Sequence, residues 1–253
     1  MVNQGVMETC ATKGGEVSLE ILKEVILRLI TVETKAIGIG VPSVVDSRKG
    51  IVYHVQNIRD WDEVHLKEIL EKEFDLPVHV NNDANCFAKG EKIYGQGRLF
   101  DNFVGITLGT GVGGGIIQRG ELLSDANCGS GEFGEMPYLD GKLEDYCGSF
   151  FFSRFNSNGL EISQRAQDGD SDAIEILNQY AMHLSVLVKM IVLSVDPEAI
   201  IFGGAISGSF QLFEQKMGEH LDDFAFPNSI NKLKILPSNL HNSGILGASA
   251  LCF

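Results

Sequence analysis

The sequence lacks a surplus of positive charge, a long apolar run and paired cysteines. Its 253 residues carry 34 acidic and 20 basic side chains, a net charge of −14 with histidine neutral. A chain so acidic repels a phosphate backbone, so we expect no nucleic-acid partner. No stretch approaches the run of about 20 apolar residues that a membrane helix needs, and the opening MVNQGVMETC lacks the basic and apolar parts of a signal peptide. We therefore expect a cytoplasmic protein that does not enter a membrane.

Cysteine is scarce and glycine is abundant. An odd number of cysteines without a CxxC spacing is typical of reduced thiols and offers no recognisable set of zinc ligands. The five cysteines are Cys10, Cys86, Cys128, Cys147 and Cys252. The 29 glycines are clustered, five of them between positions 109 and 115 and two in the pair Gly203 and Gly204. Such clusters indicate that the backbone approaches a ligand closely.

Helical and strand patterns alternate along the chain. Apolar residues at helical spacing predict a helix over 16–31, and the run KAIGIGV then predicts a buried strand. A second helix, WDEVHLKEILEKEF, precedes the strand LPVHV. The second half contains two apolar runs about a glycine turn, a long helix over about 170–195, the strands AIIFGG and KLKILPS, and a short terminal helix GILGASAL. The pattern predicts an α/β protein of two lobes that share a cleft.

We place the boundary between the two lobes near residue 95. Residues 1–95 then form an N-terminal α/β lobe and residues 96–242 a C-terminal α/β lobe, with the last helix, 243–253, rejoining the first lobe.

The stretch LGTGVGGGII predicts a glycine-tipped hairpin. Gly109, Gly111 and Gly114 match the dinucleotide pattern GxGxxG, but that pattern needs a helix to follow at once, and residues 115–117 continue a strand. A hairpin of this kind can still present backbone N–H groups and the Thr110 hydroxyl to a phosphate chain. The alternative is a glycine-rich hairpin with a structural role only.

The stretch VHVNNDAN delivers Asn82 and Asp83 from a strand to the start of a helix. An aspartate at this place is often only a helix cap. The functional alternative is a base that accepts the proton of a substrate hydroxyl as the hydroxyl attacks a γ-phosphate. Asn82 would then donate to and accept from sugar hydroxyls.

Four acids follow in the glycine-punctuated segment GSGEFGEMPYLDGKLEDYCGS, namely Glu132, Glu135, Glu144 and Asp145. They suit a solvated loop. They also suit a polyol, because carboxylates hold vicinal hydroxyls by charge-assisted hydrogen bonds. Their spacing alone does not decide between the two.

The order of these segments resembles the ROK family of repressors, open reading frames and sugar kinases. The resemblance rests on NDAN, LGTGVGGG, GEFG, LEDY and DPEAIIFGG in that order, and it covers almost the whole chain. It implies an actin-like ATPase (ribonuclease H-like) fold, with two α/β lobes around a cleft. It also implies ATP with Mg²⁺ and a sugar as ligands, and a homodimer.

The resemblance assigns roles to particular residues. It implies that Asp83 is the catalytic base. The implied sugar-binding residues are Asn57, Asn82, Asp83, Glu132, Glu135 and Glu144. The implied nucleotide-binding residues are Gly109, Thr110, Gly111, Gly113, Gly203 and Gly204.

The sequence departs from the family pattern in four places. Glu135 stands where the family usually has a histidine that touches both the sugar and a zinc ion, and Cys147 alone remains of the cysteine-rich zinc loop, so we expect no zinc. The family's GxPG turn ends in Ser43. The family begins with a strand carrying DxGGT, which contacts Mg²⁺ and the phosphates, and Met1 corresponds to a position after it. We therefore expect a missing first hairpin and slow turnover.

These observations favour an ATP-dependent kinase of a hexose, with glucose as the leading substrate. A β-glucoside or an N-acetyl-hexosamine is the alternative substrate. Two alternatives come from other classes of protein. One is a sugar-responsive transcriptional regulator, which in this family carries a winged helix-turn-helix ahead of the sugar lobe; the other is a catalytically weak sugar-binding protein.

Overall fold

The first lobe is built on two parallel strands, β1 (Ile37–Val41) and β5 (Val78–Asn82). The computed structural model describes residues 5–8, 10–55, 58–124 and 126–253. Helix α1 (Gly15–Leu29) precedes β1, and Ile26 on this helix belongs to the same apolar core as both strands. Helix α2 (Leu66–Phe74) packs against β5. Each of these elements was predicted by the apolar pattern of its segment.

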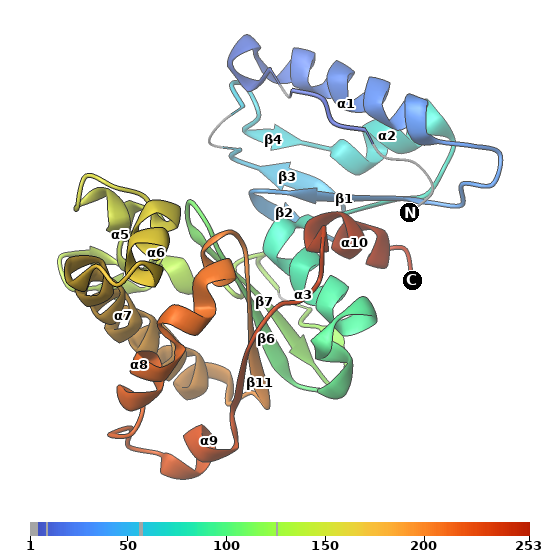
Figure 1. The fold of residues 1–253 in the computed structure, drawn as a ribbon. Coiled ribbons are helices and arrows are strands. Elements are labelled where there is room, and N and C mark those ends of the chain that lie inside the picture. Colours follow the sequence, from blue (N-terminus) through green and yellow to red (C-terminus); the bar gives the residue numbers. More distant parts are fainter. Residues whose placement is uncertain (1–4, 9, 56–57, 125) are drawn as a thin grey trace.

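A small antiparallel sheet lies beside these strands. Its strands are β2 (Val44–Asp46), β3 (Ile51–Tyr53) and β4 (Glu63–Val64), in that order. Buried Val45 and Val52 join the core of the first lobe. Among the described residues, buried side chains of α1, α2 and these strands form one apolar core. Figure 1 shows α1 and α2 together with β1 to β4 in this part of the molecule.

The second lobe contains a five-stranded sheet in the order β12-β11-β6-β7-β8. The strands are β6 (Phe103–Leu108), β7 (Val112–Gln118), β8 (Glu121–Leu122), β11 (Ala199–Gly203) and β12 (Lys234–Pro237). Strand β11 runs parallel to both β6 and β12, whereas β6, β7 and β8 are antiparallel. Every residue of β11 is buried, as expected for a central strand covered on both faces.

Two helices cover the two faces of this sheet. Alternate residues of β6, Val104 and Ile106 among them, share a core with α7 (Ser171–Val195). The opposite face carries small residues: a Cβ atom on Gly115 would lie only 2.7 Å from Cβ of Ala88. The glycines therefore let helix α3 (Asp83–Tyr94) lie directly on the sheet.

Helix α7 is long and apolar enough, by length and composition, to cross a membrane. The expectation that no stretch comes near this threshold was therefore wrong. The helix is this apolar because it is buried. Of its most apolar 18-residue stretch, 61% is buried inside the fold, and Leu184, Leu187 and Val188 are fully buried. Helix α7 is the core helix of the second lobe.

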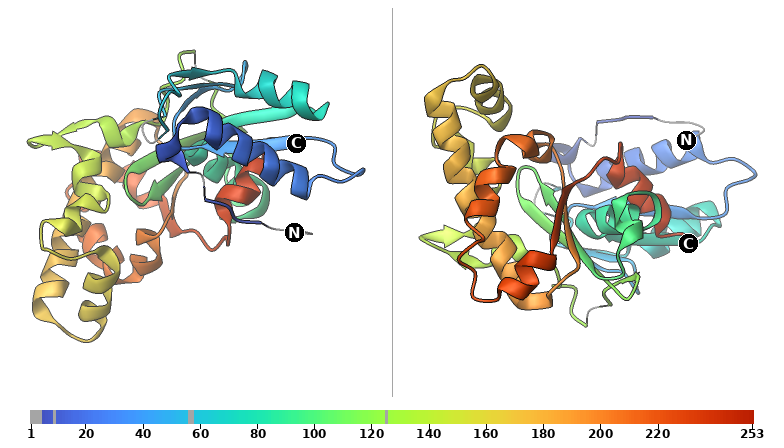
Figure 2. Two further views of the ribbon diagram at one scale, coloured as in Figure 1. Left: turned by 90° about the horizontal axis from the view of Figure 1, so that it is seen from above. Right: turned by 60° about the horizontal axis from the view of Figure 1, so that its bottom comes forward.

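The last helix, α10 (Ser243–Ala250), follows β12 and packs against α3 and β1 (Figures 1 and 2). The close approach of α10 to α3 depends on glycine, because a Cβ on Gly247 would lie 1.9 Å from the carbonyl oxygen of Cys86 on α3. Helix α10 thus contacts two elements that the sequence assigned to the first lobe. The lobe boundary near residue 95 stays a prediction.

The remaining elements lie mainly in the second lobe. They are β9 (Pro137–Tyr138), β10 (Gly141–Lys142), α4 (Leu143–Cys147), α5 (Phe150–Ser153), α6 (Gly159–Gln167), α8 (Glu214–Glu219) and α9 (Pro227–Lys232), with 3₁₀ turns η1 (Ala11–Lys13), η2 (Gln96–Leu99), η3 (Phe133–Glu135) and η4 (Ile206–Leu212). The acidic segment, for which a solvated loop was one of two interpretations, is ordered into η3, a short hairpin and α4.

Candidate functional site

Asp83 is the first residue of helix α3, directly after strand β5. The side chain is reached by solvent and lines a groove. The surrounding protein raises the pKa of the Asp83 carboxyl group above its usual value, because it removes water from the charged form; hydrogen bonds from the N–H groups of Ala84 and of Asp83 itself act in the opposite direction. A raised pKa makes this carboxylate a better proton acceptor than an ordinary aspartate.

Asn82 is the N-cap of α3. Its Oδ1 accepts hydrogen bonds from the N–H groups of Ala84 at 2.8 Å and Asn85 at 3.3 Å, and its Nδ2 donates to the carbonyl oxygen of Ser43 at 3.0 Å. The side chain thus fixes the start of the helix on which Asp83 stands. One hydrogen of Nδ2 remains for a ligand, and the predicted contact of Asn82 with the sugar stays a prediction.

Glu132 lies where the predicted sugar residues converge. Burial raises the pKa of its carboxyl group, and the negative charges of Glu135, Asp83 and Glu144 raise it further. Four carboxylates that the chain separates by up to 61 positions therefore share one electrostatic neighbourhood. Glu132 also lines a small cavity of about 130 Å³ together with Asn81, Asn82, Asn85 and Ser130.

Glu144, the second residue of α4, faces the glycine hairpin. Its Oε2 accepts a hydrogen bond from the Val112 N–H at 3.1 Å, and its Oε1 lies 3.0 Å from Nζ of Lys142. The same lysine Nζ lies 2.5 Å from Oε1 of Glu135. The structure thus brings Glu132, Glu135 and Glu144 to one side of the hairpin.

The predicted glycine hairpin is confirmed. Strands β6 and β7 pair antiparallel from Phe103 opposite Ile117 to Leu108 opposite Val112, and residues 109–111 form the turn. The N–H of Gly109 is bonded to the carbonyl oxygen of Gly111 at 3.1 Å, and Thr110 is exposed at the tip. Gly111 leaves room for Glu144, since a Cβ at this position would lie 2.2 Å from Oε2 of that side chain. The turn therefore meets the carboxylate cluster.

Gly203 and Gly204 stand at the end of β11, beside the turn end of this hairpin. Gly203 pairs with Thr107, and a Cβ on Gly204, which has a φ of +85°, would lie 2.3 Å from the carbonyl oxygen of Leu108. A Cβ on Gly203 would lie 2.5 Å from the ring of Phe87. Packing alone thus requires both glycines, and their contact with a nucleotide stays a prediction.

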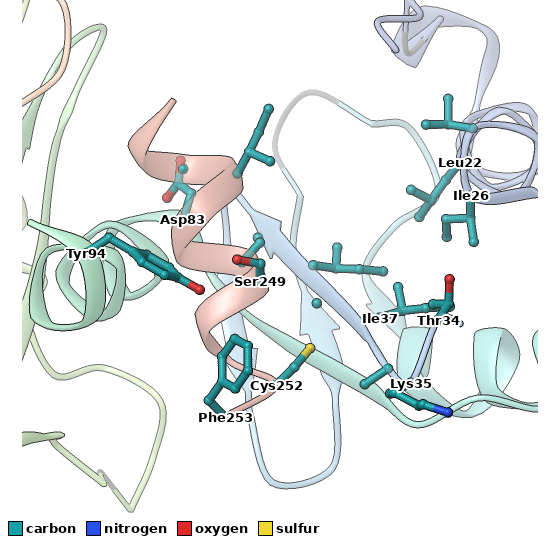
Figure 3. A pocket seen from close by; sticks show the side chains of 18 residues that line it. Leu22, Ile26, Thr34, Lys35, Ile37, Asp83, Tyr94, Ser249, Cys252 and Phe253 are labelled. Atoms are coloured by element: carbon teal, nitrogen blue, oxygen red, sulfur yellow. The ribbon is translucent and has the colours of Figure 1, made fainter. Parts of the chain in front are cut away.

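A groove of about 800 Å³ runs along strand β1 and ends at Asp83. Figure 3 shows Asp83 and Tyr94 on the side of α3, across the groove from Leu22 and Ile26 of α1. Ile37 on β1 and Cys252, just beyond α10, also line it. In the part of the chain that the structure describes, β1 pairs only with β5, so its other edge faces this groove.

Three residues of the site were missed by sequence reasoning. Asn81 and Asn85 line the small cavity beside Glu132, and the Nδ2 of Asn85 donates to the Oδ1 of Asn81 at 3.0 Å. Their position on either side of Asn82 and Asp83 was a usable signal. The sequence gives no signal for Lys142, because its contact with Glu135 depends on the β9–β10 hairpin. The predicted sugar residue Asn57 lies outside the described residues.

Within residues 5–8, 10–55, 58–124 and 126–253, no group of three or more His, Cys, Asp or Glu side chains is arranged to hold a metal ion. Cys147 is fully buried, and burial raises the pKa of its thiol. Glu135, at the place of the expected zinc-ligating histidine, is paired with Lys142 instead. The absence of zinc stays a prediction.

Comparison with known proteins gives the family. The model of the ROK family matches residues 7–150 and 155–253. The chain belongs to the ROK family. It is 29% identical to a glucokinase of Thermotoga maritima over 277 residues, covering 96% of this chain and 87% of the relative. It is 27% identical to a β-glucoside kinase of Listeria monocytogenes, covering 95% and 88% of the two chains.

Other family members extend the comparison. A xylose repressor of Bacillus spizizenii is 25% identical, with 93% of this chain and 67% of the repressor covered. The crystal structure of a ROK glucokinase of Streptomyces griseus in complex with glucose and AMPPNP superposes with a TM-score of 0.80 at 25% identity, covering 97% and 89% of the two chains. The actin-like ATPase fold predicted from the sequence is thereby confirmed.

Proposed function

We propose that this chain is an ATP-dependent sugar kinase that transfers the γ-phosphoryl group to a hydroxyl of a hexose, with glucose as the leading substrate. The observation that carries the proposal is the placement of Asp83. This aspartate has a raised pKa, lies within electrostatic reach of Glu132, and shares its helix with residues that pack against the strands of the glycine hairpin. Similarity to a glucokinase whose structure contains glucose and AMPPNP supports the same activity.

The carboxylates hold the sugar in this proposal. Glu132 and Glu144 accept hydrogen bonds from sugar hydroxyls, which are charge-assisted and stronger than neutral ones. Asn81, Asn82 and Asn85 supply amide groups on the other wall of the small cavity. Because these side chains sit on three separate segments, the sugar is oriented from several sides, and one hydroxyl is directed at Asp83.

Asp83 then acts as general base. Its carboxylate takes the proton of the sugar hydroxyl while that oxygen forms a bond to the γ-phosphorus of ATP. The bond from the γ-phosphorus to the β–γ bridging oxygen breaks, and ADP leaves with that oxygen. The raised pKa of Asp83 favours the proton transfer, and the later loss of this proton to solvent restores the carboxylate.

The glycine hairpin serves the phosphates in this proposal. The exposed Thr110 hydroxyl and the backbone of the turn at Thr110 and Gly111 offer donors without side-chain bulk. Mg²⁺ enters with ATP as part of the substrate and neutralises charge on the phosphates. A homodimer remains part of the proposal, to be checked by light scattering.

A coupled assay of ADP release over a panel of sugars tests this function. Glucose, mannose, N-acetylglucosamine, N-acetylmannosamine and a β-glucoside would each be added to the full chain with MgATP. We expect sugar-dependent ADP release, highest with a hexose, and a phosphorylated sugar in the products. ADP release that no sugar of the panel increases would contradict the proposal.

The second candidate is a sugar-responsive regulator, favoured by the similarity to the xylose repressor. A regulator of this kind binds sugar without turning it over. Calorimetry with the same sugar panel separates the two functions: saturable binding of a sugar whose presence releases no ADP supports the regulator. The net charge of −14 argues against DNA binding by these 253 residues, because it repels the phosphate backbone.

A further inference from the structure

Lys142 joins two segments of the site. It is the last residue of β10 and directly precedes α4, and its own N–H donates to Oδ2 of Asp145 at 2.9 Å. Its Nζ lies 2.5 Å from Oε1 of Glu135 and 3.0 Å from Oε1 of Glu144. The side chain is 34% exposed. The ammonium group of this partly exposed side chain thus bridges carboxylates from η3 and α4.

The bridge continues into the glycine hairpin. The second oxygen of Glu144, Oε2, accepts the N–H of Val112 at 3.1 Å, so both oxygens of this carboxylate have a partner. A carboxylate held at both oxygens keeps one orientation, and its remaining lone pairs point in fixed directions. Lys142 therefore sets the direction in which Glu144 can accept a further hydrogen bond.

The charge of Lys142 also matters to its surroundings. Asp83, Glu132, Glu135 and Glu144 share one neighbourhood, in which the negative charges of the other three raise the pKa of Glu132. Among the ion pairs of the described residues, Lys142 is the one cation paired with any of these four side chains. An anionic phosphate chain must approach this acidic cluster, and a fixed cation beside it reduces the repulsion.

We propose that Lys142 is a positioning residue of the sugar site, which holds Glu135 and Glu144 in the orientation that accepts hydroxyls of a polyol and offsets part of the acidic charge around Asp83. The inference rests on the proposed function and extends it to a residue outside the sequence motifs. Lys142 touches neither reacting atom. Its effect reaches the substrate through Glu144.

The test compares Lys142→Met with Lys142→Arg in the full chain, using the sugar that the wild type binds best. We expect Lys142→Met to raise both the sugar Kd from calorimetry and the sugar KM on the order of 10-fold, because one ordered charge-assisted contact is lost. We expect kcat to change less than several-fold. Lys142→Arg keeps the charge and should restore most of the affinity.

A pH profile provides a readout that a structural role alone would not move. Removing the cation leaves the negative charges of Glu135 and Glu144 without their partner, which raises the pKa of Glu132 further; Asp83 and Asp145 are the other carboxylates nearby. The acid limb of kcat/KM should therefore move to higher pH in Lys142→Met and return in Lys142→Arg. The matched control is Lys189→Met. Lys189 lies on α7, and its Nζ is 2.7 Å from Oδ1 of Asp223. This variant should leave the sugar Kd, the sugar KM and the pH profile unchanged.

The outcomes separate this inference from the proposed function. Sugar binding without phosphorylation by the wild type would refute the kinase proposal, while the comparison of Kd values would still test Lys142. Equal Kd values for wild type and Lys142→Met, or an arginine variant as impaired as the methionine variant, would overturn the positioning role. If Lys142→Met does not fold, Lys142→Gln takes its place at this half-exposed position, with the same expected result. A wild type that binds no sugar of the panel would overturn both.

Discussion

Asp83 and Asn82 are neighbours with different tasks. Asn82 caps helix α3 and ties it to the Ser43 carbonyl, whereas the Asp83 carboxylate faces a groove and has a raised pKa. The helix start is therefore stabilised by one side chain and leaves the other available for chemistry. This division allows their roles to be tested separately.

The first prediction concerns the acid limb of the pH profile. A general base must be ionised, so, if Asp83 has the proposed role, kcat/KM should fall as the pH falls through its pKa in the folded protein. Because the fold raises this pKa, we expect the midpoint to lie above the usual aspartate value of about 3.9. Initial rates from pH 4 to 8, with circular dichroism to verify that the protein stays folded, measure it. A rate that stays constant down to pH 4 would contradict the assignment.

The second prediction concerns the cap. Replacing Asn82 with alanine removes the acceptor for two N–H groups, which should lower the free energy of unfolding by about 1 kcal/mol. Serine keeps a capping oxygen, so Asn82→Ser should retain most of the stability. Urea unfolding of both variants measures the difference. If the serine variant is stable but has a raised sugar KM, Asn82 also binds the sugar; equal destabilisation by alanine and serine would mean that capping is not its structural role.

At the scale of elements, the contact between α10 and α3 depends on one glycine more than on another. A Cβ on Gly247 would lie 1.9 Å from the Cys86 carbonyl oxygen, while a Cβ on Gly244 of the same helix would meet nothing within 4 Å. We expect Gly247→Ala to lower the free energy of unfolding by about 1–3 kcal/mol, as overpacking does. Gly244→Ala is the matched control and should leave stability unchanged or slightly higher, since alanine favours helix. Equal unfolding midpoints for the two variants would show that α10 is not packed as described.

A further prediction concerns strand β1. The Ile37 N–H donates to the Pro77 carbonyl oxygen, and backbone groups alternate along a strand, so the N–H groups of Gly38 and Gly40 point to the edge away from β5. We expect these two amides to exchange with solvent faster than that of Ile39. Amide hydrogen exchange followed by NMR measures this. Equal protection of all three would mean that another segment pairs with this edge.

The main elements were predictable because their patterns are local. The stripe of α7, the apolar run of β11 and the glycine turn between β6 and β7 each lie within one short stretch of sequence. The segment from Glu132 to Cys147 was not predictable, since its order comes from tertiary contacts such as Tyr180 donating to the Cys147 carbonyl at 2.7 Å. Lys142 was missed for the same reason. Its partner Glu135 is reached only through the β9–β10 hairpin.

At the scale of the whole molecule, α3 connects the proposed chemistry to both lobes. It begins at the end of β5, lies on the five-stranded sheet and is covered by α10 (Figure 1). Movement of the lobes would therefore change the surroundings of Asp83 at the point where sugar and phosphate must meet. In the proposed function, closure around both substrates would exclude water from that point, as it does in kinases whose lobes close.

The measurement that tests the central claim most directly is the turnover and sugar affinity of Asp83→Asn beside the wild type. Asparagine keeps the shape and removes a carboxylate whose charge is unfavourable in its surroundings, so the variant should melt at the wild-type temperature or above it. We expect kcat to fall on the order of 10²-fold or more, with the sugar Kd from calorimetry within several-fold of the wild type. An Asp83→Asn variant that phosphorylates its sugar at nearly the wild-type rate would contradict the account.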